Sequence, residues 1–69
     1  MKVSYKKLWI LLIKKDISQV DFRKDLNIAT GTMSKLRKNE EVALGVLLRI
    51  CDYLDCNIGD VCDFVKEEN

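Results

Sequence analysis

Residues 30 to 40, TGTMSKLRKNE, gather the side chains with the clearest capacity for binding. The stretch holds three hydroxyls and three cations, namely Thr30, Thr32, Ser34, Lys35, Arg37 and Lys38. Only two side chains of the kind that fill a core, Met33 and Leu36, stand among them. Hydroxyls donate and accept hydrogen bonds and cations attract phosphate, so this composition suits a helix that enters a groove lined with phosphates.

Helical periodicity divides this stretch into two faces. Ala29, Met33 and Leu36 fall at positions i, i+4 and i+7 and are predicted to point inward. The opposite face then collects Gly31, Ser34, Lys35 and Lys38, with Thr30 and Thr32 on its flanks. Glycine on that face lets another backbone approach closely.

Two earlier helices must position this one. Residues 3 to 15 place Tyr5, Leu8, Trp9 and Leu12 at helical spacing, and Trp9 is interpreted as a core residue. Core packing accounts for most of the wider apolar arc, with contact to a partner chain through Ile10 or Ile13 as the alternative.

The second helix is predicted over residues 19 to 26. Ser18 to Asp21 has the form of a capping box, with Asp in the position where Glu or Gln is preferred. Phe22 and Leu26 lie four residues apart and are predicted to be buried together. Asn27 tolerates the left-handed conformation that ends a helix, and Ile28 can then enter the core.

The rest of the chain is more apolar and more acidic. A fourth helix is predicted from an apolar set comprising Leu44, Leu47, Leu48, Ile50, Cys51 and Leu54. Asn57 can cap a short fifth helix with Asp60 in its first turn, packed down by Ile58, Val61, Cys62 and Val65. No run alternates well enough for a strand. Phe64 and Val65 either close the core or form a symmetric dimer patch.

These elements predict an all-α fold of five short helices in one domain that spans residues 1 to 69. The formal charge of +1 conceals a strong asymmetry, because residues 1 to 39 carry +7 and residues 40 to 69 carry −6. This split suggests a basic face for a polyanion and an acidic region kept away from it.

Other function classes find little support in the sequence. Three cysteines without any histidine or CxxC pair favour reduced, mostly buried thiols over a metal or redox site or a disulfide. No arrangement of nucleophile and base and no Gly-rich phosphate loop is present, so we expect no enzyme, no metal and no cofactor. The apolar run LWILLI is too short for a membrane span, and the chain is expected to be cytoplasmic.

The order of certain residues resembles the helix-turn-helix of the Cro/phage-repressor (XRE) family. The motif covers about residues 18 to 38 and rests on Gln19, Phe22, Leu26, Asn27, Ile28, Met33 and Leu36. The continuation LLRICDYLDCNIGDV is similar to the family's usual core, so the likeness extends over roughly residues 3 to 65. It is closest to short stand-alone members that begin with a Tyr-x-x-Leu-Trp helix.

The resemblance implies a lambda-repressor-like fold whose third helix, near residues 30 to 38, lies in the major groove of double-stranded DNA. Thr30, Gly31, Thr32 and Lys35 match the positions that face base edges, with Ser34 beside them. Gln19 matches a position that touches a phosphate at the start of helix two. Lys38, with Arg37, would add phosphate contacts that fix the register.

Three departures from the family pattern affect packing rather than DNA contacts. Arg23 stands where a small Ala is usual between the two helices, so its side chain must reach outward. Ala29 and Ala43 replace the usual Ser or Thr caps, at a cost of about 1 kcal/mol each. Asn27 replaces Gly in the turn.

The resemblance predicts a small transcriptional regulator, a repressor, that binds as a homodimer to a two-fold DNA site. No small-molecule site is evident in the sequence, and no membrane association is expected. The alternative is a protein-interaction or antitoxin-like module on the same fold with little or no operator specificity.

Overall fold

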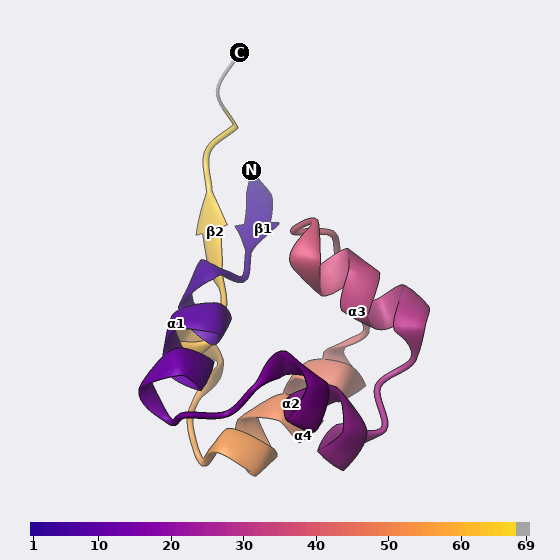
Figure 1. Cartoon of the computed structure of the whole chain (residues 1–69). Helices are drawn as coiled ribbons and strands as arrows, with labels where there is room; N and C mark the ends of the chain where they lie inside the picture. Colours follow the sequence, from indigo (N-terminus) through magenta and orange to yellow (C-terminus); the bar gives the residue numbers. More distant parts are fainter. Residues whose placement is uncertain (68–69) are drawn as a thin grey trace.

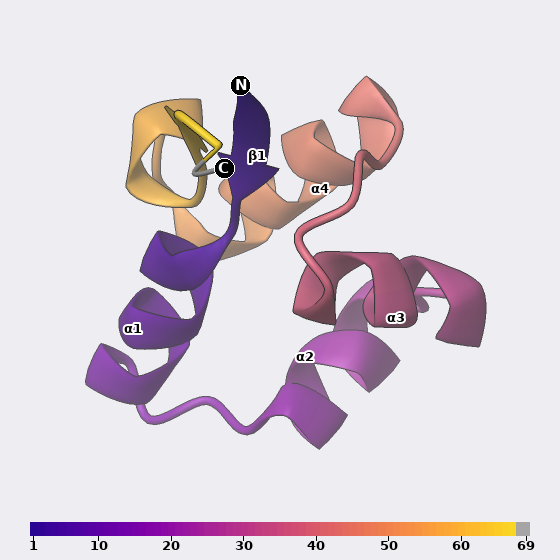
Figure 2. The ribbon, with the colours of Figure 1, turned by 90° about the horizontal axis from the view of Figure 1, so that it is seen from above.

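A computed structural model describes residues 1–67 and shows four helices joined by short turns (Figure 1). The elements, in chain order, are β1 (Lys2–Ser4), α1 (Lys6–Lys14), α2 (Gln19–Leu26), α3 (Thr30–Arg37), α4 (Leu44–Leu54), the 3-10 turn η1 (Ile58–Asp60) and β2 (Asp63–Val65). Seen from above, α1 lies on one side of the molecule and α3 on the other (Figure 2).

One apolar core holds the helices together. Its fully buried members come from every helix and from the segments between them: Tyr5, Leu8, Leu12, Phe22, Ile28, Met33, Leu36, Ile50, Leu54 and Val61. The Phe22 ring packs edge-on to Trp9 at 6.5 Å and lies 6.2 Å from the ring of Tyr53. These aromatic contacts pack α2 against α1 and α4, and the half-buried Trp9 lies against the core at its margin.

The two ends of the described chain differ from the predicted helices. Val3 does not begin α1, because Lys2–Ser4 form a strand that pairs antiparallel with Asp63–Val65. The expected fifth helix is only the 3-10 turn Ile58–Asp60, after which the chain becomes extended. Strands of three residues are too short to show alternation, and the pairing joins opposite ends of the sequence, so no local pattern predicts it.

All four α-helices end in the same way, although none uses glycine. The residues in the left-handed conformation are Asp16, Asn27, Asn39 and Asp55, with φ between 51° and 58°. After each of them, the next N–H donates to the carbonyl five residues earlier, as in Ile17 to Leu12 at 2.9 Å and Ile28 to Arg23 at 3.0 Å. These are Schellman endings, and they confirm the left-handed Asn27 that the sequence predicted.

Two of these endings can be improved. Replacing Asp16 or Asp55 with Gly is expected to raise the free energy of unfolding by about 1 kcal/mol each, because Gly adopts positive φ without strain. The change also removes a carboxylate from the negative end of a helix. Urea unfolding followed by circular dichroism measures the gain.

Asn39→Gly is the matched control for that prediction. The Asn39 Oδ1 atom accepts the backbone N–H of Tyr5 at 2.9 Å, so glycine there loses a hydrogen bond while it relieves the same strain. We expect no gain in stability from this variant. An equal gain at all three positions would mean that the left-handed strain alone decides the effect.

Tyr5 ties the start of α1 to the turn after α3. Its N–H bonds to Asn39, and its hydroxyl donates to the carbonyl oxygen of Glu40 at 2.8 Å. Burial raises the pKa of Tyr5 above its usual value of 10.0, which agrees with a hydroxyl that is enclosed by the fold. Tyr5, which matches the Tyr at the start of helix one in the family pattern, therefore connects two parts of the chain that are distant in sequence.

The N-terminal caps agree with the sequence prediction at Asn57 and in part at Ser18, where only one of the two bonds of the predicted capping box forms. The Ser18 hydroxyl accepts the N–H of Asp21 at 3.0 Å at the start of α2, and Asn57 caps η1 with Asp60 completing the box. Neither Ala29 nor Ala43 makes a side-chain cap bond. Ala29 also differs from its predicted inward position, because it is an extended, exposed cap residue that precedes the helical stripe.

Candidate nucleic-acid interface

Helix α3 presents a polar outer face to solvent. Met33 and Leu36 are buried at 1% and 0% exposure and fix the helix against the core, as predicted. The residues predicted to bind are distributed over its outer side: Thr30, Gly31, Lys35 and Lys38 are exposed, while Thr32 and Ser34 are half-buried. The structure therefore brings all six α3 candidates onto one accessible helix, with Thr32 and Ser34 closer to the body of the protein.

Gln19 joins this surface from the first position of α2. Its Oε1 atom accepts the Nε–H of Arg37 at 3.2 Å, which links the start of α2 to the end of α3. The bond leaves the amide NH₂ of Gln19 and the outer nitrogens of Arg37 available as donors. Sequence reasoning placed both residues near phosphates but missed their contact, because a pair 18 residues apart gives no local signal.

The cations of this surface make no salt bridge with any residue from 1 to 67. Within residues 1–67 the structure has a single salt bridge, between Lys7 and Asp63 at 3.6 Å, and both partners are about half exposed. Lys35, Arg37 and Lys38 therefore have no carboxylate partner in that part of the chain. These cations, beside the exposed hydroxyl of Thr30 and the half-buried hydroxyls of Thr32 and Ser34, form a surface suited to a phosphate backbone.

Arg23 reaches into solvent, as its replacement of a small Ala requires. The residue is exposed in the middle of α2, and Phe22 beside it is fully buried. The helix pair therefore packs through Phe22, Met33 and Leu36 without a clash from the longer side chain. Leu26 is half-buried rather than fully buried.

Gly31 is not required by the packing of α3. A Cβ atom at this position would meet nothing within 4 Å, and the backbone does not adopt positive φ there. Gly45 occupies the equivalent second position of α4 and is equally open. Since glycine weakens a helix, its presence on the outer face of α3 agrees with close approach of a ligand at this point.

Gly31→Ala therefore separates stability from binding. We expect α3 to become more stable by up to about 1 kcal/mol, while DNA affinity falls because the added methyl group holds the backbone away from its ligand. Gly45→Ala is the matched control, with the same stabilisation and unchanged affinity. Thermal unfolding and fluorescence anisotropy with labelled DNA measure the two effects, and unchanged affinity in both variants would remove Gly31 from the interface.

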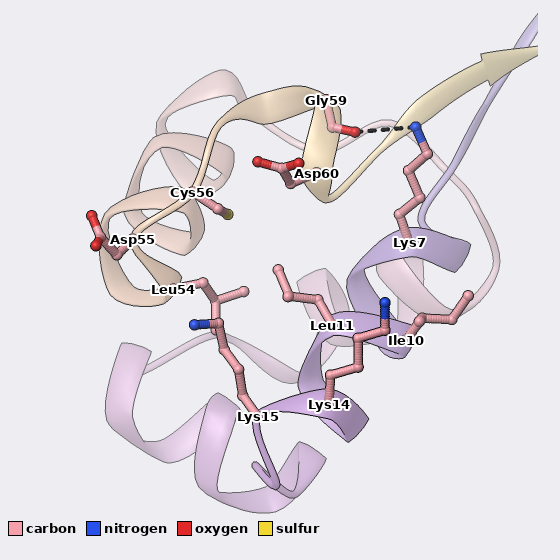
Figure 3. A pocket seen from close by; sticks show the side chains of 10 residues that line it. All are labelled: Lys7, Ile10, Leu11, Lys14, Lys15, Leu54, Asp55, Cys56, Gly59 and Asp60. Atoms are coloured by element: carbon pink, nitrogen blue, oxygen red, sulfur yellow. Dashed lines mark hydrogen bonds between the residues drawn. The ribbon is translucent and has the colours of Figure 1, made fainter.

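A hollow with polar and apolar walls lies on the α1 side of the molecule, between α1 and the segment that follows α4 (Figure 3). Lys7 donates from its Nζ to the Gly59 carbonyl at 3.1 Å, and Lys14 and Lys15 line the same hollow as Asp55 and Asp60. The basic half of the sequence is thus not one face kept apart from the acidic half, because the fold places α1 beside the acidic end. Lys7, Lys14 and Lys15 therefore face the acidic end of the chain, while Lys35, Arg37 and Lys38 belong to the surface described above.

The three cysteines are half-buried free thiols. Burial, and then the neighbouring Cys51, raise the pKa of Cys56 to about 11, and burial also raises the pKa of Cys62. Both thiols are therefore protonated at neutral pH and are poor nucleophiles. Cys51 and Cys56 occupy the paired apolar positions of the Schellman ending of α4. In the region that the structure covers, no three His, Cys, Asp or Glu side chains are placed to share a metal ion.

No helix in residues 1–67 is both long and apolar enough to cross a lipid bilayer. The longest, α4, runs for 11 residues.

Two helices joined by a left-handed Asn turn, with the second helix exposed along a polar face, define a helix-turn-helix domain. The family model of the Cro/C1-type HTH DNA-binding domain matches residues 7–67, and the chain belongs to this family. The family binds DNA and is not enzymatic, which confirms the resemblance, the all-α class and the expectation that the chain is not an enzyme. Within residues 1–67 the predicted helix count is corrected to four α-helices and a 3-10 turn, and the strand pair β1–β2 is added.

A solved structure supports the same assignment. The chain is similar to the crystal structure of the transcriptional regulator VanUg, with a TM-score of 0.93 and 45% sequence identity over 96% of this chain and 88% of that chain. Among curated proteins, no sequence matches this chain significantly.

Proposed function

We propose that this chain is a small transcriptional regulator, a repressor, that acts in the cytoplasm as a single domain on operator DNA. The observation that carries the proposal is α3 itself, on a DNA-binding fold: the exposed hydroxyl of Thr30, an open Gly31 and cations that have no carboxylate partner within residues 1–67. The similarity to VanUg, a transcriptional regulator, supports the regulatory role.

In this proposal α3 lies in the major groove with its first turns against the bases. Thr30, Gly31, Thr32 and Lys35 face base edges, and Ser34 lies beside them. Lysine donors suit the O6 and N7 acceptors of guanine, and hydroxyls bond to any base. The exposed positions of Thr30, Gly31 and Lys35 support these roles, while Thr32 and Ser34 reach the groove only at close approach.

Phosphate contacts set the register of that helix. Gln19 and Lys38 flank α3 and bind the backbone on either side of the groove, and Arg37 steadies Gln19 through its Nε–H. The amide NH₂ of Gln19 then points its donors at a phosphate together with the unpaired N–H groups of the α2 start. Such contacts carry no sequence information but align the helix with the bases.

Operator specificity requires two copies. One module of this size neutralises only a few phosphates, so a monomer binds loosely and loses affinity steeply with salt. A homodimer on a two-fold site, with half-sites about 34 Å apart, supplies the missing affinity. Occupation of such a site next to a promoter blocks transcription, which is the sense in which we propose a repressor.

A selection from random double-stranded DNA at about 0.15 M salt tests this proposal, because non-specific attraction is weak there. We expect enrichment of an inverted repeat. A folded protein that enriches no sequence would contradict operator binding and would favour the protein-interaction module on the same fold, which a pull-down then tests.

A further inference from the structure

A groove of about 430 Å³ lies between the strand pair and the start of α4. Its wall is mainly apolar and includes Val3, Leu44, Leu47, Ile58, Cys62 and Phe64. We propose that this groove is the interface between two copies of the chain, with Phe64 of each copy seated against Leu44 in the groove of the other. The proposal rests on the proposed function, since it names the surface through which the operator-binding dimer forms.

Phe64 is an apolar side chain that its own chain leaves uncovered. It is 71% exposed on β2, opposite Val3 of β1, so the two side chains share one face of the strand pair. Leu44, across the groove at the start of α4, is 70% exposed. Large apolar side chains gathered in this way on a small domain mark an interaction surface.

A second copy fits this surface because the patch is complementary to itself. A two-fold interface requires the same patch on both partners, with residue i of one against residue j of the other and the reverse. Here the exposed Phe64 ring and the apolar groove lie side by side on one patch. When two copies are related by a 180° rotation, the ring of each copy can therefore enter the groove of the other. The charged residues on the wall, Lys2 and Glu41, are of opposite sign, so the patch does not repel itself.

The groove also lies in the right place relative to α3. Glu41, Val42 and Leu44 line it and follow α3 directly in the chain. None of the residues that line the groove belongs to α3, so the side chains proposed to bind DNA are not part of this interface. The molecule measures 37 × 24 × 19 Å, so equivalent points in two touching copies can lie about 34 Å apart, one turn of DNA.

Two other strongly exposed apolar side chains lie away from this groove. Ile13 on α1 and Val20 on α2 are 78% and 62% exposed, but neither borders this groove. The hollow beside α1 carries three lysines and two aspartates, and Ile13 does not line it either. Ile13 is therefore the control position for the interface.

Sedimentation equilibrium without DNA tests the proposal with three variants of the full chain. We expect the wild type to dimerise, and Phe64→Glu and Leu44→Lys each to raise the dimer dissociation constant by about tenfold or more, as for loss of an interface anchor. Ile13→Glu should behave like the wild type. Both interface residues are exposed in the monomer, so circular dichroism should show that each variant keeps its fold.

Mixing the two variants gives the sharper test. When Phe64→Glu meets Leu44→Lys, one of the two equal contacts places glutamate against lysine and the other keeps Phe64 against Leu44. The mixture should therefore form heterodimers more tightly than either variant forms homodimers. A monomeric wild type, an undisturbed dimer in the variants, or no recovery in the mixture would each overturn the proposal.

The DNA selection keeps the two proposals distinguishable. A dimer that enriches no DNA sequence would contradict operator binding and leave this interface intact. A monomer that enriches a single half-site would contradict this interface and leave operator binding intact.

Discussion

Lys35→Ala is expected to lower operator affinity by about 10- to 100-fold and to relax the preference for the base pair that Lys35 faces. The side chain is exposed in the last turn of α3, away from the buried Met33 and Leu36, and has no carboxylate partner within residues 1–67. Its removal costs the fold almost nothing, so the loss reports on binding. Titrations with the selected operator and with single-base variants measure both effects.

Lys38→Ala is the matched control for charge. Both lysines carry one positive charge and both are exposed, but Lys38 lies at the end of α3, where we propose that it meets a phosphate. We expect it to weaken all DNA sequences about equally and to reduce the slope of log K against log salt by roughly one. If Lys35→Ala behaved in the same way, α3 would contact the backbone without reading bases.

The central part of this fold follows from local chemistry. A hydroxyl that caps α2, a residue that accepts positive φ at Asn27 and apolar side chains at helical spacing all act within a few residues of one another. Such features are visible in sequence, and the structure places α2 and α3 where these features predict. The face of α3 follows from Met33 and Leu36 alone, because burying those two side chains fixes the direction of all the others.

The remaining features are contacts between distant parts of the chain. Tyr5 bonds to Asn39 and Glu40, Arg37 to Gln19, and Lys2–Ser4 pair with Asp63–Val65. The partners in each of these contacts can be identified only when the fold is known. The location of Phe64 is another example. Whether it lies in the core or in a dimer patch depends on the pairing of β1 with β2, which helical periodicity cannot predict. Its exposure in the structure favours the dimer patch.

The same distinction limits what net charge can predict. The opposite charges of the two halves suggested separate faces, yet the fold returns the acidic end of the chain to the lysines of α1. Charge along a sequence indicates a partner only after the elements that carry it are known to share a surface. On α3 they do, because the cations lie within one helix.

Phe22→Ala is expected to unfold the domain. The ring is fully buried and contacts the aromatic rings of Trp9 and Tyr53, so it joins α2 to α1 and α4 at once. Truncation of a buried Phe lowers the free energy of unfolding by about 3–5 kcal/mol. The core of a domain of this size supplies a net free energy of unfolding of only about 3–5 kcal/mol. Circular dichroism at 25 °C should show loss of helix in this variant.

Phe22→Leu separates the size of the side chain from its aromatic contacts. It keeps most of the apolar volume, so we expect a folded protein that is destabilised by about 1 to 1.5 kcal/mol. Because α2 and α3 remain in place, this variant should keep its DNA affinity, whereas Phe22→Ala should lose affinity together with helix. A folded Phe22→Ala protein with intact DNA binding would mean that Met33 and Leu36 alone orient α3, and that the aromatic contacts serve only the junction with α1 and α4.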